Sequence, residues 1–182
     1  MNFSKKIKKK NLALGSVERL LAINILNEIL NKNNSLHDLR MRNNFFPKNC
    51  PFSIKSRSIT IVKNVLRNLN VIDDLISKYL KKSPNKRFKI YLRVCFSEII
   101  IDDIPFYATV DSILKLMKNE KKLLYYVNLC NAICRNFVKD YEKGLNLTNF
   151  SFPKKFQKYL NDIYGKNVEK KISNIFQIDN PI

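Results

Sequence analysis

The chain has 182 residues, of which 45% are hydrophobic, and its 34 Lys and Arg outnumber 15 Asp and Glu to give a formal net charge of +19. This length predicts one domain, or one domain with a small appendage, and the apolar content excludes wholesale disorder because it suffices for a buried core. The positive charge suits a polyanionic partner, either a nucleic acid or an anionic membrane surface.

The charge is spread unevenly along the chain. Residues 1–10 contain five Lys and no acid, residues 51–100 contain eleven bases and three acids, and residues 101–150 contain seven bases and six acids. Part of the basicity follows a general bias of the chain towards Lys, Asn and Ile. The uneven distribution is therefore more informative about a partner than the total charge is.

Neither a membrane-spanning segment nor a signal peptide is expected. No apolar run approaches the ~18 residues of a membrane-spanning helix, and Glu18 and Arg19 interrupt the apolar stretch that follows the basic start. These features predict a cytoplasmic protein without a membrane partner. Cys95, Cys130 and Cys134 lie within apolar helical patterns, which predict buried free thiols rather than a disulfide framework.

The first predicted helix follows a basic arm. Residues 1–15 form the arm, and Ser16 is the expected N-cap of a helix that ends at Asn31–Asn34. The apolar residues of this helix fall within one arc of a helical wheel, as in an amphipathic helix. A short turn or helix is expected to reach Arg42, and the Pro and Phe residues of Asn43–Pro51 predict a loop.

The second major helix is predicted to begin near Ser53. Its apolar residues share one face, and Arg57, Lys63 and Arg67 share the opposite face. A further helix is predicted over about Val71–Lys81, where the Ser-Pro pair that follows ends it.

The most apolar helix is predicted to begin at about Lys86. Asp102 and Asp103 are expected to cap the next helix, with Pro105 in its first turn. The segment after that, Lys121–Lys139, is apolar almost all round. It is therefore predicted to lie in the centre of a bundle.

The C-terminal part is predicted to be a linker and a small helical tail. Gly144–Ser151 is the expected linker, a short helix stops at Gly165, and a last helix is expected over about Val168–Phe176. No strand pairing stands out, so the predicted fold class is all-α, with the helices arranged as an orthogonal bundle. The predicted divisions are residues 1–15 for the arm, 16–143 for the helical domain and 144–182 for the linker and tail.

Residue types that support catalysis are scarce. His37 is the only histidine and lies in a polar stretch, so no histidine-based dyad is available. Cys130 and Cys134 are one helical turn apart, a spacing that two metal ligands can use, but core packing is favoured because no further soft ligand lies nearby. The three Gly stand alone, which excludes a glycine-rich phosphate loop. The residues therefore predict no catalytic site, no metal and no cofactor.

The basic residues are stronger candidates for a binding surface. A cationic arm that leads into a helix start at Arg19 is a suitable grip for RNA, because arginine binds phosphate bidentately and stacks on bases. An arginine lying over the end of the bundle is an equal alternative for Arg19, and a solvated helix face is an equal alternative for the bases of the second helix. The candidate RNA-binding residues are Lys5, Lys6, Lys8, Lys9, Lys10, Arg19, Arg57, Lys63 and Arg67.

Five segments, in order and with compatible spacing, resemble the NusB-like RNA-binding family over about residues 16–140. The first three are the helix with Arg19, Ala22, Leu26 and Leu30, the helix with Ser53, Lys55, Arg57 and Val65-Leu66-Arg67, and the pair Ile72-Asp73. The other two are Leu92-Arg93 with Glu98, Asp103-Ile104-Pro105, Ala108, Val110 and Asp111, and the run Asn131-Ala132-Ile133-Cys134-Arg135.

This resemblance implies a NusB-like orthogonal helical bundle with a short helical C-terminal tail, acting as a non-enzymatic RNA-binding module. The family has two branches: transcription antitermination factors, which bind boxA RNA with ribosomal protein S10, and the N-terminal domains of rRNA cytosine-C5 methyltransferases of the RsmB/Sun type. Val65-Leu66-Arg67 and the tail from Phe152 to Ile182 are more similar to the methyltransferase branch. The catalytic half of that branch, with its glycine motif and Pro-Cys loop, is not expected in this chain.

The expected function is therefore binding of rRNA or its precursor, as the targeting part of an rRNA methyltransferase system. One alternative is transcription antitermination with boxA RNA and ribosomal protein S10. A second alternative is a scaffold that pairs with a separately encoded methyltransferase half.

Overall fold

The computed structural model describes residues 14–41, 46, 47, 49–80, 82, 84–144, 154–165, 168 and 172. Within these residues every regular element is helical, which confirms the predicted all-α class. The elements are α2 (Leu14–Lys32), α3 (Leu36–Met41), α4 (Phe52–Arg67), α5 (Leu69–Tyr79), α6 (Lys86–Ile100), α7 (Phe106–Lys118), the 3-10 helix η1 (Lys121–Tyr126), α8 (Val127–Glu142) and α9 (Lys154–Tyr164). The predicted basic arm, apart from its last two residues, and most of the predicted linker and last helix lie outside the described residues.

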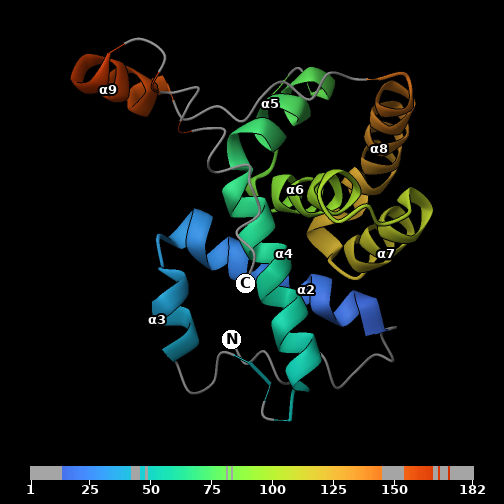
Figure 1. The fold of residues 1–182 in the computed structure, drawn as a ribbon. Coiled ribbons are helices and arrows are strands. Elements are labelled where there is room, and N and C mark those ends of the chain that lie inside the picture. Colours follow the sequence, from blue (N-terminus) through green and yellow to red (C-terminus); the bar gives the residue numbers. More distant parts are fainter. Residues whose placement is uncertain are drawn as a thin grey trace.

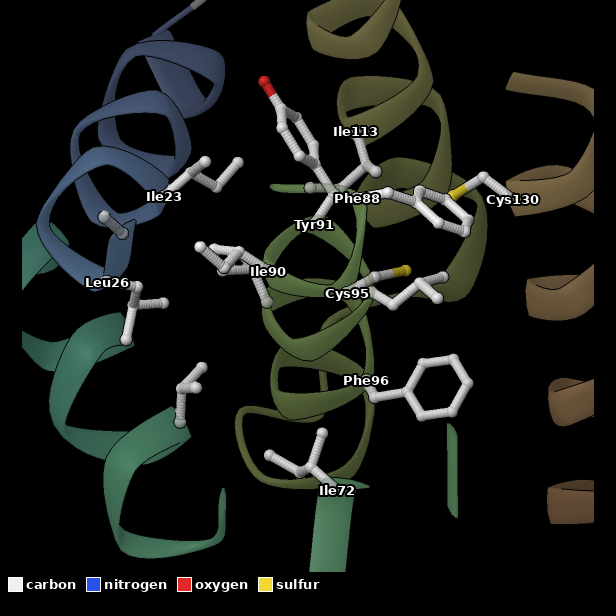
Figure 2. Packing of buried hydrophobic residues seen from close by; sticks show 14 of the residues in the cluster. Ile23, Leu26, Ile72, Phe88, Ile90, Tyr91, Cys95, Phe96, Ile113 and Cys130 are labelled. Carbon is white, nitrogen blue, oxygen red and sulfur yellow. The ribbon is translucent and has the colours of Figure 1, made fainter. Parts of the chain in front are cut away.

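Helix α6 forms the centre of the bundle. It contacts α2, α4, α5, α7 and α8, and α4 and α8 lie on opposite sides of it (Figures 1 and 2). Its residues are apolar on nearly every side, so a helix of this composition is stable only when neighbours surround it. Ile90 faces Ile23 and Leu26 of α2, whereas Phe88 and Phe96 face α8 (Figure 2). All five of these side chains are buried.

The prediction that the segment 121–139 lies at the centre was wrong. This segment divides into η1 and α8, and α8 buries only one side, through Cys130, Ile133, Cys134 and Phe137. Its other side is exposed to solvent and includes the apolar residue Leu129. The central position belongs to α6, whose buried residues surround the helix axis.

Two helix starts differ in detail from the prediction. Helix α2 already includes Leu14, so Ser16 lies inside the helix and its hydroxyl contacts Ser112 Oγ of α7 at 3.1 Å instead of capping. Helix α7 begins after Pro105, and neither preceding aspartate caps it. The first turn of α6 does have a side-chain cap, because Asn85 Oδ1 accepts hydrogen bonds from two backbone amides.

An aromatic cluster joins α8 to the centre of the bundle. The rings of Phe96 and Phe137 are stacked with their centroids 4.1 Å apart, and Tyr79 of α5 meets both rings edge-on. The Tyr79 hydroxyl donates a hydrogen bond to the Asp140 carboxylate over 2.8 Å. Desolvation by burial and this neighbouring carboxylate raise the pKa of Tyr79 to about 12.

The three helical cysteines are free and buried, as predicted from their apolar surroundings. The sulfur atoms of Cys95 and Cys134 lie 3.5 Å apart between α6 and α8. Burial contributes to a raised pKa of both thiols, so the reactive thiolate form is suppressed. Within the described residues these thiols act as small apolar groups of the core.

Candidate nucleic-acid interface

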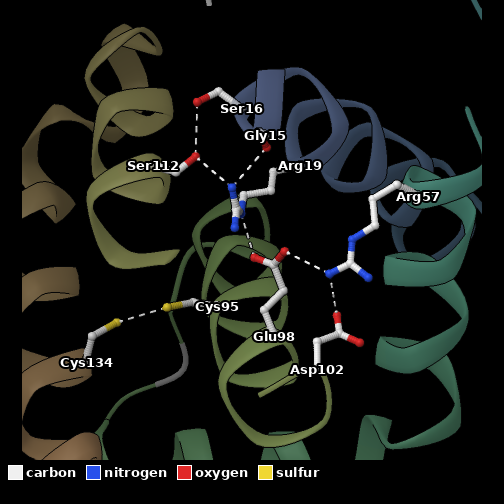
Figure 3. Close-up of polar contacts among 9 residues, drawn as sticks. All are labelled: Gly15, Ser16, Arg19, Arg57, Cys95, Glu98, Asp102, Ser112 and Cys134. Atoms are coloured by element: carbon white, nitrogen blue, oxygen red, sulfur yellow. Dashed lines mark hydrogen bonds and ion pairs between the residues drawn. The ribbon is translucent and has the colours of Figure 1, made fainter. Parts of the chain in front are cut away.

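The side chain of Arg19 is directed into the bundle. It is 9% exposed, and its Nε lies 2.6 Å from a carboxylate oxygen of Glu98, which is 1% exposed (Figure 3). The same guanidinium donates to the carbonyl oxygen of Gly15 over 3.0 Å and lies 3.4 Å from Ser112 Oγ. Neither of the two roles considered for Arg19 included a buried ion pair of this kind. The ion pair with Glu98 joins α2 to α6, and the contact with Ser112 joins α2 to α7.

Arg57 belongs to the same network. Its Nη2 lies 2.9 Å from Asp102 and 3.8 Å from Glu98 (Figure 3). Asn64 donates a hydrogen bond to the other oxygen of Asp102 over 2.8 Å. Asp102 therefore holds α4 against the end of α6, which explains why it does not cap α7. Burial raises the pKa of Glu98, and the positive charges of Arg19 and Arg57 oppose that increase.

A second ion-pair cluster joins α5 to α6. Both carboxylate oxygens of Asp73 accept hydrogen bonds from Arg93 over 2.7 Å, and Lys89 donates to one of them over 2.8 Å. Burial acts to raise the pKa of Asp73, but the hydrogen bonds from Arg93 and Lys89 lower it below its usual value. These two cations of α6 are therefore also engaged inside the protein.

Replacing Asp73 with Asn is expected to lower the free energy of unfolding by about 1.5–3 kcal/mol at pH 7, because hydrogen bonds to a charged group are lost. A carboxylate whose pKa is lowered by folding stabilises the protein above its unfolded-state pKa of about 3.9, and this contribution is lost as the pH falls through the folded-state value. Urea unfolding at pH 7, 5 and 3 should show the deficit shrinking at acidic pH. Asp74→Asn, at an exposed neighbour, is the matched control, and an equal deficit at every pH contradicts this role of Asp73.

Two of the predicted RNA-binding residues are exposed and available. Lys63 and Arg67 lie on the solvent side of α4, and no ion pair or hydrogen bond to either side chain is formed within the described residues. Arg57 of the same helix differs from them, because its guanidinium is engaged by Asp102. The structure thus brings Arg19 and Arg57 together around Glu98 and leaves Lys63 and Arg67 outside that network. Lys5, Lys6, Lys8, Lys9 and Lys10 lie outside the described residues.

The sequence interpretation missed an exposed surface on η1. Tyr125 is 88% exposed, and Leu124 is also largely exposed. Lys121 and Lys122 are exposed beside them. Aromatic rings next to cations are the side-chain types that stack on unpaired bases and contact phosphates. The sequence did contain a signal for this surface. The Lys-Lys pair lies directly before Leu-Leu-Tyr-Tyr, and two adjacent charges indicate that this segment is not buried on every side.

Other kinds of site have little support in the described part of the chain. No group of three or more His, Cys, Asp and Glu residues there is arranged to hold a metal ion. None of the helices that the structure describes combines the length and the apolar character needed to cross a bilayer.

The fold and the surface define an all-α domain built around one buried helix, braced by internal ion pairs and carrying unpaired cations on its outside. The model of the NusB family matches residues 16–139 of the chain, which is more than half of its length. The chain therefore belongs to the NusB family, as the sequence resemblance indicated. Neither the comparison with curated proteins nor the comparison with solved structures gave a match.

Proposed function

We propose that this protein is a non-enzymatic RNA-binding module. The chain belongs to the NusB family, for which RNA binding is implied. The observation that supports this function in the structure is that the cations fall into two groups, one paired with acids and one exposed to solvent. Arg19, Arg57, Lys89 and Arg93 are engaged by buried or half-buried acids, whereas Lys63 and Arg67 are exposed without such partners among the described residues. Exposed, unpaired cations are the groups that neutralise phosphates.

The proposed RNA-contacting residues are the arm lysines Lys5, Lys6, Lys8, Lys9 and Lys10, together with Lys63 and Arg67. The exposed residues Lys121, Lys122 and Tyr125 of η1 are added to them. Arg19 and Arg57 are left out of direct phosphate contact, because their guanidinium groups neutralise Glu98 and Asp102. Their role in this proposal is to hold α2 and α4 in position.

The proposed target is rRNA or its precursor, in a cytoplasmic rRNA methyltransferase system. The similarity of Val65-Leu66-Arg67 and of the tail to the methyltransferase branch supports this choice. In that system the module positions the catalytic half of the methyltransferase on its substrate. A domain of the NusB type is not itself catalytic, which fits such a division of labour.

The RNA-binding function is tested by titrating labelled single-stranded rRNA fragments at several salt concentrations. Replacing Lys63 and Arg67 with Ala is expected to weaken binding and to reduce the slope of log affinity against log salt by about 1.4, since each phosphate contact on a single strand contributes about 0.7. Replacing the five arm lysines with Ala should weaken binding to all sequences.

The matched control removes two charges elsewhere, at Lys32 and Lys115, which form exposed ion pairs with Glu28 and Asp111. This variant should keep the salt slope of the unaltered protein apart from a small general loss. Affinity of the unaltered protein that does not change between low and moderate salt contradicts the RNA-binding function.

Antitermination remains the second candidate, because family membership alone is compatible with it. It requires preferential binding of boxA-type RNA and a complex with ribosomal protein S10. Co-purification with S10 and tighter binding of boxA RNA than of rRNA fragments favour antitermination. Recovery of a methyltransferase half in the same experiment favours the rRNA-targeting function.

A further inference from the structure

The outer side of α8 carries a row of three cations, Arg135, Lys139 and Lys143 at its C-terminal end. They are spaced four residues apart, so they follow one side of the helix. All three are exposed, and no ion pair or hydrogen bond to their side chains is formed within the described residues. Asp140 points away from the row and accepts the hydrogen bond of Tyr79. Glu142 is the one exposed acid among the described residues of α8.

Two other helices of this bundle each pair an exposed cation with an acid. Lys32 is 2.6 Å from Glu28 on α2, and Lys115 is 2.6 Å from Asp111 on α7, both one turn apart. No acid stands three or four residues before Arg135, where Ala132 and Asn131 lie. Asp140, three residues before Lys143, accepts the hydrogen bond of Tyr79, and Glu142 lies three residues after Lys139. Among the described residues no acid forms an ion pair with the row, so this side of α8 carries three cations against the single exposed acid Glu142.

The geometry of the row fits a chain of phosphates. Four residues of an α-helix advance about 6 Å, a step comparable with that between successive phosphates of an extended single strand. Short exposed side chains lie along the same helix, at Asn128 and Ala132 before the row and at Asn136 within it, and Glu142 is the exposed acid near its end. Such short side chains let a polynucleotide backbone approach the helix and offer hydrogen bonds to it. The row begins about three turns after Tyr125, so one strand can pass from the η1 surface onto α8.

We propose that Arg135, Lys139 and Lys143 form an extended phosphate track for single-stranded RNA, which continues from the η1 surface along the outer side of α8. This inference rests on the proposed RNA-binding function and specifies the path and the strandedness of the RNA. The distance from Tyr125 to Lys143 along the helix axis is about 27 Å. The track is therefore occupied only by an RNA long enough to reach beyond η1.

The proposal is tested with oligouridylates of increasing length, from about 4 to about 16 nucleotides. Affinity of the unaltered protein should rise with length as the track becomes occupied. The variant Arg135→Ala, Lys139→Ala, Lys143→Ala should match the unaltered protein on the shortest RNA and stop gaining affinity on longer RNA. On the longest RNA its salt slope should be lower by about 2, which corresponds to three phosphate contacts.

Two further variants make the result specific. Lys32→Ala, Lys115→Ala, Lys158→Ala removes three charges from three other helices and should keep the full gain with length. Arg135→Gln, Lys139→Gln, Lys143→Gln keeps long polar side chains on α8 and should lose the gain as the alanine variant does. Circular dichroism and thermal unfolding verify that each variant is folded.

The outcomes separate this inference from the function on which it rests. If the unaltered protein binds none of the RNAs, the RNA-binding function itself fails. If it binds, but the α8 variant follows it at every length or loses no more than the charge-matched control, only the phosphate track is wrong. Tighter binding of a duplex than of the single strand of the same length also overturns the track.

Discussion

Glu98→Ala is expected to lower the free energy of unfolding by about 3–5 kcal/mol, because it leaves a buried charge without its partner. The guanidinium of Arg19 lies 2.6 Å from Glu98 and has little access to water. Arg57, at 3.8 Å from Glu98, is half-buried and keeps Asp102 as a partner. Arg19 is therefore the cation that mainly loses its partner when Glu98 is removed.

Urea unfolding measures this effect, and the double variant Arg19→Met, Glu98→Leu is its most informative control. Replacing both charges of a buried pair with apolar residues of similar volume is often neutral, since the desolvation cost disappears with the attraction. The exposed pair Lys115–Asp111 supplies the surface comparison, and its removal should cost about 1 kcal/mol or less. A loss below 1 kcal/mol for Glu98→Ala contradicts the role assigned to the pair.

The same double variant separates the two possible uses of Arg19. If Arg19 acts only by holding α2 to α6, the folded double variant should bind RNA with the affinity and the salt slope of the unaltered protein. A salt slope reduced by about 0.7 shows instead that the Arg19 side chain reaches a phosphate.

Phe137→Ala is expected to be the other large loss, about 3–5 kcal/mol of unfolding free energy. Phe137 is fully buried and stacks on Phe96 at 4.1 Å, with Tyr79 and Tyr141 against its other sides. Truncating this ring leaves a cavity between α5, α6 and α8, and the helices around it can relax only in part. The aromatic cluster is the part of the α8 packing that joins this helix to α5 and α6.

Urea unfolding of Phe137→Ala, Phe137→Leu and Leu129→Ala checks this expectation. Leucine refills part of the volume, so its loss should be clearly smaller than that of alanine. Leu129 lies on the same helix but is 40% exposed, and its truncation should stay within about 0.5 kcal/mol. Equal losses at positions 129 and 137 mean that α8 does not pack as described.

The helices themselves could be predicted from the sequence because helical periodicity is a local property. The period of apolar residues predicted a start near Ser53 and another near Lys86, and the structure places these starts at Phe52 and Lys86. The prediction for α8 was wrong because Leu129 and Ala132 made its pattern apolar on all sides, although both are exposed. A helical wheel does not show which apolar positions find a neighbour.

The pairing of charges could not be predicted from local patterns. Arg19 and Glu98 are 79 residues apart, and Asp73 and Arg93 are 20 apart. All four residues belong to the segments that resemble the family, yet in the structure they bind one another. These four polar residues of the family-like segments are therefore internal braces, whereas Arg67 and Arg135 of the same segments are exposed and are among the residues proposed to contact RNA. This is also why the family resemblance predicted the fold more surely than the site.

The pair between Arg19 and Glu98 also orders the events during synthesis of the chain. Glu98 emerges from the ribosome 79 residues after Arg19, a delay of about 4–16 s at ordinary elongation rates. Until then α2 has neither its countercharge nor the central helix against which it packs. The first half of the chain thus waits without its central helix, and the bundle can be completed only after α6, α7 and α8 have emerged.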